Sequence, residues 1–397
     1  MSSSIPSGFR LAGVHCGIKR NPNKEDLTLV IADAPVVAAG VYTQNLVCAA
    51  PVILDRERTP SDDIRAVVVN SGNANACTGE KGMQDAQEMT RLAGEVCGAD
   101  ASQVLVMSTG IIGRHLPMEK IAAGISAAHQ QLGTSDEHWQ AAARGILTTD
   151  NGVKMASRTV EIGGRKITIA GIAKGAGMIG PNMATFLGLV LTDAPLSVEV
   201  AQQVLLHATD HSFNCISVEG HTSTNDTQLL LASGTAGGDP LSGDELAQFQ
   251  TVLTELCIEL ARKIPDDGEG ATHLITIDVR GSEDRPGAKQ IARTIADSAL
   301  VKTAVTGGDP NWGRIVSAAG YAGVSFNPAE VDLSVNGHLL YKKGAPVPFD
   351  AATVSGSIKE QRETHIELTV GQGAGECRFW TSDLTVEYVR FNSEYTT

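Results

Sequence analysis

Apolar and polar positions along the chain follow two spacings, one typical of strands and one typical of helices. Short apolar runs bounded by turn residues predict strands over 27–31, 36–42, 66–69, 104–107, 216–218, 228–232 and 273–279. Apolar positions that repeat every three to four residues predict helices over 84–97, 117–131, 136–146, 198–208, 243–263 and 288–301. Alternating stretches over 158–162 and 166–172 flank Gly163-Gly164 and predict a hairpin. This mixed pattern favours an α+β fold.

The length of the chain indicates how many lobes these elements form. A chain of 397 residues is longer than single hydrophobic cores usually reach, so we expect two compact lobes rather than one long domain. The turn-rich stretch 281–287 is the best boundary, which gives a main lobe over 1–284 and a C-terminal lobe over 285–397. Abundant glycine, 42 residues, and an aromatic fraction of only 4% suit strands joined by tight turns.

Composition and charge exclude several classes of function. The formal net charge is −14 without any block of Lys or Arg, which argues against a nucleic-acid or anionic-membrane surface. The first residues lack the apolar core of a signal peptide, and no apolar run reaches the ~18 residues of a membrane span, so we expect a soluble, cytoplasmic protein. The 7 cysteines are scattered singly without a CxxC pair, which favours reduced, buried thiols over a disulfide framework or a zinc site.

The most informative segment runs from Lys174 to Thr185 and reads Lys174-Gly-Ala-Gly-Met-Ile-Gly-Pro-Asn-Met-Ala184-Thr185. A loop rich in glycine here places a small residue and then a hydroxyl residue at the start of an apolar strand. Threonine is a poor nucleophile without an adjacent base, and cleavage of the preceding bond would make its own α-amino group that base. An α-amino pKa of ~7.7–8.0 leaves a useful neutral fraction at physiological pH.

Taken without any comparison, these residues also fit plain structural roles. Thr185 could be a strand former after a turn, and the turn at Ser108-Thr109-Gly110 could simply end a strand. Thr148 and Thr149 could cap a helix end, Lys174 could be a solvated charge and Glu269 a surface acid on a tight turn. The C-terminal residues could be a frayed tail.

A resemblance to a known family, ornithine acetyltransferase, decides between these interpretations. The run K-G-x-G-M-I-x-P-N-M-A-T followed by an apolar strand and T-D-A resembles the self-cleaving segment of that family. Further segments match in the same order along nearly the whole chain: Asn70-Ser71-Gly72-Asn73-Ala74-Asn75-Ala76, Ser108-Thr109-Gly110-Ile111-Ile112-Gly113, Thr148-Thr149-Asp150, Asp267-Gly268-Glu269-Gly270-Ala271-Thr272, Gly307-Gly308-Asp309-Pro310-Asn311-Trp312-Gly313-Arg314 and the C-terminal D-L-T with its asparagine and final threonine.

The resemblance implies a fold and an activity. The fold would be a helix/sheet/sheet/helix main lobe with a smaller C-terminal α/β lobe, cleaved between Ala184 and Thr185 into an alpha chain of 1–184 and a beta chain of 185–397. The activity would be transfer of acetyl from N2-acetylornithine to glutamate by ping-pong kinetics in arginine biosynthesis. We expect no metal and no cofactor, and the two kinds of chain would associate, as a heterotetramer with two of each. The sequence leaves open whether acetyl-CoA is a second donor.

The resemblance also implies roles for individual residues, which we carry over position by position. Thr185 would be the nucleophile, and Thr109 with the backbone N–H of Gly110 would form the oxyanion hole. Glu269 would receive the cationic group of the amino-acid substrate. The other substrate contacts would be Thr148, with Thr149 as the alternative, and Lys174, Asn392 and Thr397.

One segment departs from the family pattern. Glu219-Gly220-His221-Thr222-Ser223-Thr224-Asn225-Asp226 has glutamate and histidine where the pattern D-G-D-T-S-T-N-D has aspartates. His221 invites a role as general base, but the amine of Thr185 would already serve, so a structural or site-edge histidine is the expectation.

Two rival functions remain to be separated by experiment. An aminopeptidase-like relative would use the same N-terminal nucleophile to hydrolyse an amide, whereas the motifs favour transfer. An uncleaved chain could instead be a small-molecule or anion-binding module whose glycine-rich loops present backbone N–H groups.

Overall fold

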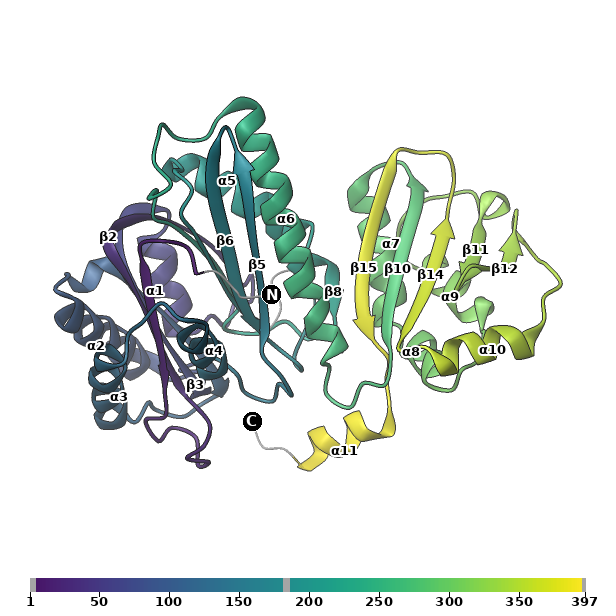
Figure 1. The fold of residues 1–397 in the computed structure, drawn as a ribbon. Helices are drawn as coiled ribbons and strands as arrows, with labels where there is room; N and C mark the ends of the chain where they lie inside the picture. The colour runs from purple at the N-terminus through teal and green to yellow at the C-terminus, as the bar shows by residue number, and fades with distance from the viewer. Residues whose placement is uncertain (1–4, 181–185, 395–397) are drawn as a thin grey trace.

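The computed structural model describes residues 5–180 and 186–394 and divides into two lobes, each built on its own β-sheet (Figure 1). The predicted residues Ala184, Thr185 and Thr397 lie outside the described part. In the larger lobe the strands are hydrogen-bonded in the order β4-β3-β2-β9-β7-β6-β5, and β1 pairs with β2. Their bounds are β1 Phe9–Val14, β2 Leu27–Tyr42, β3 Ser61–Asn73, β4 Val104–Ile111, β5 Lys154–Ile162, β6 Arg165–Lys174, β7 Leu187–Thr192 and β9 Thr227–Ala232.

A bend in β2 folds this sheet onto itself. The early part of β2 pairs with β3, where Leu27 faces Asn70, and its late part pairs with β9, where Tyr42 faces Thr227. The register shifts between Ile31 and Val36, which is the place where the sequence pattern predicts two separate strands. The bend turns one continuous sheet into two stacked layers, because each half of β2 belongs to a different layer.

The alternation of side chains along the strands gives the lobe its layers. On β3, Val67 lies in the core between the two sheet layers, whereas Val68 lies in the core under the helices. On β7, Leu189 faces the other sheet layer and Val190 faces helices on the opposite side. Strands buried on both faces read as continuous apolar runs, as these do.

Helices cover both outer faces, which confirms the predicted helix/sheet/sheet/helix arrangement. Met89 of α2 and Ile121 of α3 pack in the same core as Val68, and Val204 of α5 and Leu256 of α6 pack in the same core as Val190. Trp139 of α4 is fully buried at the rim of the core between the sheets. The helices are α1 Ala50–Arg58, α2 Gly79–Cys97, α3 Met118–Gln130, α4 Asp136–Gly145, α5 Val198–Asp210 and α6 Gly243–Asp266.

The smaller lobe has a second sheet in the order β13-β12-β11-β14-β10-β15-β8. Its strands are β8 Ile216–Ser217, β10 Leu274–Ser282, β11 Asp332–Val335, β12 His338–Lys342, β13 Ala345–Pro346, β14 Glu363–Thr369 and β15 Gly375–Ser382. The helices that follow β10 are α7 Arg285–Asp297, α8 Ala299–Thr306, α9 Trp312–Gly320 and α10 Ala351–Glu360. Figure 1 shows the last helix, α11 (Val386–Glu394), running back beneath the larger lobe.

Two sequence-based boundaries differ from the structure. β10 lies between β14 and β15, so the second sheet already includes Leu274. The stretch 281–287 contains the end of β10, at Ser282, and the start of α7, at Arg285, so it lies inside the smaller lobe rather than at a border at 284/285. The helix predicted over 288–301 is broken at Ser298, whose extended backbone ends α7 and whose hydroxyl accepts a hydrogen bond from Val301 N at the start of α8. Serine at an N-cap favours this break over a continuous helix.

Candidate active site

Strand ends of the larger lobe converge on one polar region. Lys174 ends β6 opposite Leu187, which begins β7, and Leu187 in turn pairs with Thr227 at the start of β9. From the other sheet layer, the ends of β3 and β4 reach the same place, because the side-chain amide of Asn225 donates to the carbonyls of Ala74, 2.6 Å, and Ser108, 2.9 Å. The motifs at Ser108, Lys174 and Asn225, far apart in sequence, therefore meet.

The chain that follows the predicted nucleophile is firmly anchored. The backbone N–H of Phe186 donates to Oδ1 of Asp226 over 3.0 Å, and its ring stacks on Phe213 with centroids 4.2 Å apart. Burial raises the pKa of Asp226 well above its usual range. Ala184 and Thr185 are not described, so the site is defined by the residues on both sides of them.

Thr109 and Gly110 lie in the last part of β4, where this strand pairs with β3. The Thr109 side chain is buried, and Gly110 has a φ of 127°, where a Cβ would come within 2.4 Å of the Gly72 backbone. Only glycine fits this close approach. Ser108 Oγ donates to Asn70 Oδ1 over 2.6 Å, and Asn70 donates to the carbonyl of Asn73 over 2.8 Å, so the asparagine loop fixes this wall of the site.

Lys174 lies in a buried network of alternating charges. Its ammonium is 4.0 Å from Asp150, whose other oxygen accepts hydrogen bonds from Lys154, 2.7 Å, and from Gly175 N, 2.6 Å. Burial lowers the pKa of Lys174, while Asp150 and then Glu269 act in the opposite direction. Although burial opposes it, the charges of Lys174 and Lys154 hold the pKa of Asp150 below its usual range. The Asp150 carboxylate therefore joins Lys174, Lys154 and the Gly175 backbone in one network.

Thr148 and Thr149 lie in the turn just before this carboxylate. The backbone N–H of Thr148 donates to Asp150 Oδ2 over 3.1 Å, and both threonines are half-buried. Their position beside the Lys174 network is compatible with the predicted substrate contact of either residue.

Glu269 lies against the loop that leads to the predicted nucleophile. Its backbone N–H donates to the carbonyl of Ala176 over 2.9 Å, and a Cβ added to Gly177 would meet its carboxylate at 2.4 Å. The side-chain amide of Asn392, on α11, donates to Glu269 Oε2 over 3.0 Å. The loop before Thr185, the Glu269 loop and the C-terminal helix thus share one contact region.

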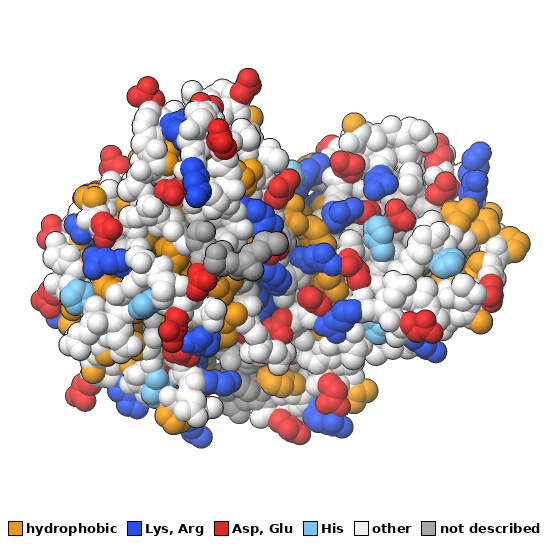
Figure 2. Space-filling view, in the orientation of Figure 1, with side chains coloured by type: hydrophobic (Ala, Val, Ile, Leu, Met, Phe, Trp, Pro, Cys, Tyr) orange, Lys and Arg blue, Asp and Glu red, His pale blue; other side chains and the backbone are white. Residues whose placement is uncertain are grey.

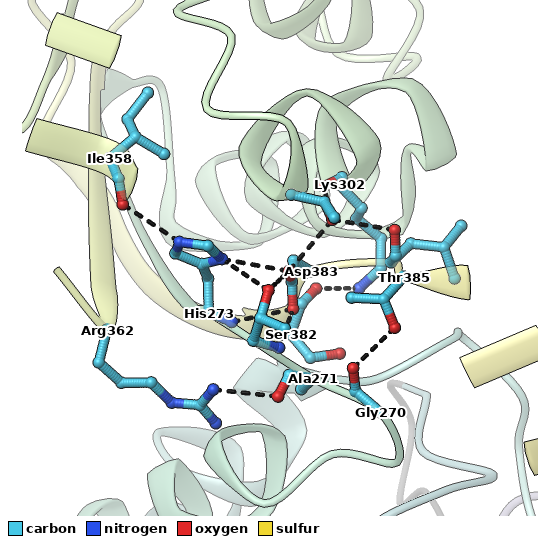
Figure 3. A network of polar contacts seen from close by, with 12 residues as sticks. Gly270, Ala271, His273, Lys302, Ile358, Arg362, Ser382, Asp383 and Thr385 are labelled. Atoms are coloured by element: carbon cyan, nitrogen blue, oxygen red, sulfur yellow. Dashed lines mark hydrogen bonds and ion pairs between the residues drawn. The ribbon is translucent and has the colours of Figure 1, made fainter. Parts of the chain in front are cut away.

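A polar network in the smaller lobe holds the Glu269 loop in place (Figure 3). Asp383 accepts hydrogen bonds from the backbone N–H of Thr272, 2.8 Å, and of His273, 3.0 Å. The Thr385 hydroxyl donates to the carbonyl of Gly270 over 2.7 Å, and Lys302 donates to the Thr381 hydroxyl over 2.8 Å. Although burial opposes it, hydrogen bonds from His273 and Thr272 lower the pKa of Asp383 to about 2. The second lobe therefore positions the Glu269 loop.

The segment that departs from the family pattern also borders the site. The backbone N–H groups of Val218, Glu219 and Gly220 all donate to the carbonyl of Ile179, over 2.9, 3.3 and 2.9 Å. His221, two residues further, is exposed, as a site-edge histidine would be. Sequence reasoning assigned no role to Glu219, and the only signal in its favour was the departure itself.

A separate cleft lies between the lobes, away from this site. It has a volume of about 430 Å³ between α6 and β15 and is lined on the β-sheet side by Arg280, Arg378 and Cys377. Figure 2 shows Lys and Arg side chains on both sides of this hollow. Arg378 donates to both carboxylate oxygens of Asp278, over 2.7 and 2.8 Å, so that arginine is already paired. The cleft contains none of the predicted site residues.

Comparison with known proteins identifies the family to which the chain is similar. The ArgJ family matches residues 10–397. The arginine biosynthesis bifunctional protein ArgJ of Rhodopirellula baltica is 49% identical, over 100% of this chain and 97% of the relative. The protein of the same name from Symbiobacterium thermophilum is 47% identical, over 99% of this chain and 98% of the relative. The crystal structure of ArgJ from Bacillus halodurans has a TM-score of 0.50 and 37% identity, covering 51% of this chain and 96% of that chain.

The layered lobe gathers a buried lysine, carboxylates with shifted pKa values and backbone donors at its strand ends, a combination that marks functional sites. With relatives named for arginine biosynthesis, this defines an enzyme. Within that class the chain belongs to the ArgJ family. Among the described residues, every helix is too short or too polar to cross a bilayer.

Proposed function

We propose that the chain is a glutamate N-acetyltransferase that moves acetyl from N2-acetyl-L-ornithine to Thr185 and then to the amine of L-glutamate. The products would be L-ornithine and N-acetyl-L-glutamate. The observation that carries the proposal is the contact between the Glu269 carboxylate and Gly177, because it puts an acid for a cationic substrate beside the loop that leads to Thr185. The relatives are named bifunctional, which supports acetyl-CoA as a second donor.

Self-cleavage between Ala184 and Thr185 would create the nucleophile. The new α-amino group would take the proton from the Thr185 hydroxyl as that oxygen attacks the acetyl carbonyl. The chain of the solved Bacillus halodurans relative supports two fragments, because 96% of that chain corresponds to only about half, 51%, of this one.

The tetrahedral intermediate needs two donors for its oxyanion, and we assign them to the Thr109 hydroxyl and the backbone N–H of Gly110. Support comes from the place of both at the end of β4, held by Asn70 through Ser108 and by Asn225. A preorganised donor of this kind can lower the barrier by roughly 3–4 kcal/mol.

Glu269 and Asn392 would bind the amino-acid part of the substrate, together with Lys174, either Thr148 or Thr149, and Thr397. Their assignment is supported by the Asn392 to Glu269 hydrogen bond and by the position of Thr148 beside the Lys174 network. No metal or prosthetic group enters this chemistry. The fragments 1–184 and 185–397 would stay together through the pairing of β6 with β7, and we infer a cytoplasmic heterotetramer with two copies of each.

The proposal is tested by intact mass measurement, amino-terminal sequencing and product analysis on the purified protein. We expect two fragments, a new terminus that reads Thr-Phe-Leu, and formation of ornithine and N-acetylglutamate from acetylornithine and glutamate. Release of acetate to water without transfer to glutamate would indicate a hydrolase instead. A single inactive chain would indicate a binding module.

A further inference from the structure

Glu219 has a carboxyl group that the proposed mechanism does not use. Both carboxyl oxygens are inaccessible to solvent, and neither makes a hydrogen bond of ordinary geometry to a described residue. Burial, with the nearby Glu269 carboxylate acting in the same direction and the backbone of Ile179 against it, raises the pKa of Glu219 to about 8. An isolated charge in such surroundings is costly, so the group is held in its neutral form near pH 7.

The backbone around Glu219 is fixed beside the loop that leads to the predicted nucleophile. The bonds from residues 218–220 to the Ile179 carbonyl hold the turn, and a Cβ on Gly180 would come within 2.2 Å of the Gly220 backbone. Because Glu269 contacts Gly177 in the same loop, the two acids approach this loop from different elements.

Glu219 is surrounded by charged and titratable side chains that belong to several different elements. Glu269 faces it from the loop after α6, Tyr388 from α11 and Lys302 from α8. Asp297, at the end of α7, accepts a hydrogen bond from Ser217 over 2.6 Å and would lie 3.3 Å from a Cβ on Gly220. His221 is exposed on the same segment.

Lys302, the cation in this set, does not pair with Glu219. Its ammonium donates to the Thr381 hydroxyl over 2.8 Å and to the carbonyl of Ser382. Burial lowers the pKa of Lys302 to about 8. The positive charge of Lys302 lowers the pKa of Glu219, but less than burial raises it. Among the described residues, Glu219 and Glu269 therefore share a region in which no cation forms an ion pair with Glu219.

We propose that Glu219 and Glu269 together form the pocket for the side-chain ammonium of a cationic amino acid, and that Glu219 releases its proton when this ligand binds. The proposal rests on the function proposed above, which supplies the class of ligand. In the binding step the ammonium stays protonated, the Glu219 carboxylic acid becomes a carboxylate, and its proton passes to the solvent.

The pH dependence of binding follows from this exchange. Below about pH 8 the free protein holds a proton on Glu219, and the ligand must displace it. The affinity for the cation should therefore rise with pH between 6 and 8, by up to roughly tenfold per unit, and level off above that range. A ligand of the same length without the side-chain ammonium, such as L-norvaline, should not displace this proton.

Calorimetric titration of the purified protein with L-ornithine, in buffers of different ionisation heat, measures the protons released. At pH 7 we expect release on the order of one proton per bound ornithine and none from Glu219 with L-norvaline. Glu219→Gln should bind ornithine with this release lost and with a flatter pH profile, while Glu219→Asp should keep it. Glu255→Gln, an exposed acid on α6, is the matched control and should behave as the wild type.

The outcomes separate this proposal from the proposed function. Ornithine binding without proton release, or release that persists unchanged in Glu219→Gln, overturns the role of Glu219 and leaves the acetyltransferase proposal intact. Failure of ornithine to bind the wild type overturns both. Loss of release in Glu219→Gln and its retention in Glu219→Asp and Glu255→Gln supports it, because a purely structural role would not change the proton count.

Discussion

Asn392, on the last described helix, donates its side-chain amide to Glu269 over 3.0 Å, so the C-terminal helix and the loop after α6 are in direct contact. The two residues are 123 positions apart in sequence, and the network around Asp383 holds both of their segments. The C-terminal helix is therefore part of the candidate site and not a free tail.

The nucleophile is tested first by removing its hydroxyl. Thr185→Ala should remain a single uncleaved chain without acetyl transfer, because both steps need the oxygen. Thr185→Ser should still cleave, at a lower rate, because it keeps the hydroxyl. Denaturing mass spectrometry and a coupled ornithine assay give the two readouts, and two normal fragments from Thr185→Ala would rule out Thr185.

Thr109 is expected to act mainly in the transition state. Thr109→Ala should lower kcat by roughly 10²–10³ and leave KM nearly unchanged, since in the proposed mechanism the lost donor would face charge that develops during the reaction. Steady-state kinetics on fully processed protein measure this, with mass spectrometry as the control for processing. A wild-type kcat would exclude the oxyanion role.

Glu269 should matter for binding and not for cleavage. A partly desolvated carboxylate–ammonium contact contributes ~1.5–3 kcal/mol, so Glu269→Gln should raise KM for acetylornithine by about tenfold to over a hundredfold. Processing should remain complete, because it involves no external substrate. Asn392→Ala, which removes the amide that orients Glu269, should raise KM in the same direction by less. An unchanged KM in processed Glu269→Gln would make the loop structural.

Asp383 links stability to pH. Its pKa of about 2 lies below the ordinary value of 3.8, so the folded state favours the carboxylate. The resulting stabilisation, about 2 kcal/mol, is present above pH 4 and is lost as the pH falls through 2. Asp383→Asn should therefore reduce the free energy of unfolding at pH 7, and the difference from wild type should shrink below pH 4. Urea unfolding of the uncleaved Thr185→Ala chain, with and without Asp383→Asn, measures this, with the exposed Asp62→Asn as a control that should change little.

Local patterns predicted the fold well where a single element carries its own signal. The layers followed from the resemblance, and the apolar runs at 66–69 and 104–107 are indeed strands. The bend of β2 was missed because Asp33 and Pro35 interrupt the apolar pattern, which reads as two strands when pairing partners are unknown. The break at Ser298 was missed because the apolar spacing of α7 continues in phase into α8.

The residues of the candidate site also fall into two groups, those that a local motif predicted and those that only the folded structure reveals. Motifs predicted Thr109, Lys174 and Glu269, because each lies in a local run that has chemical sense. Asp226 and Glu219 were not assigned roles, because their importance depends on what long-range packing brings to them: the Phe186 N–H to one and the Glu269 loop to the other. Burial of an acid and its distant neighbours cannot be read from spacing.

The pairing of β6 with β7 determines how the protein could refold before and after the proposed cut. Lys174 on β6 pairs with Leu187 on β7, so the two strands hold both ends of the segment in which the cut is proposed. Before the cut, an unfolded molecule refolds as one chain at a rate independent of concentration. After it, the two pieces must first find each other, and dilution makes their loss effectively irreversible. The proposed cut would therefore turn refolding into a bimolecular step, and a cleaved protein would persist because it unfolds slowly.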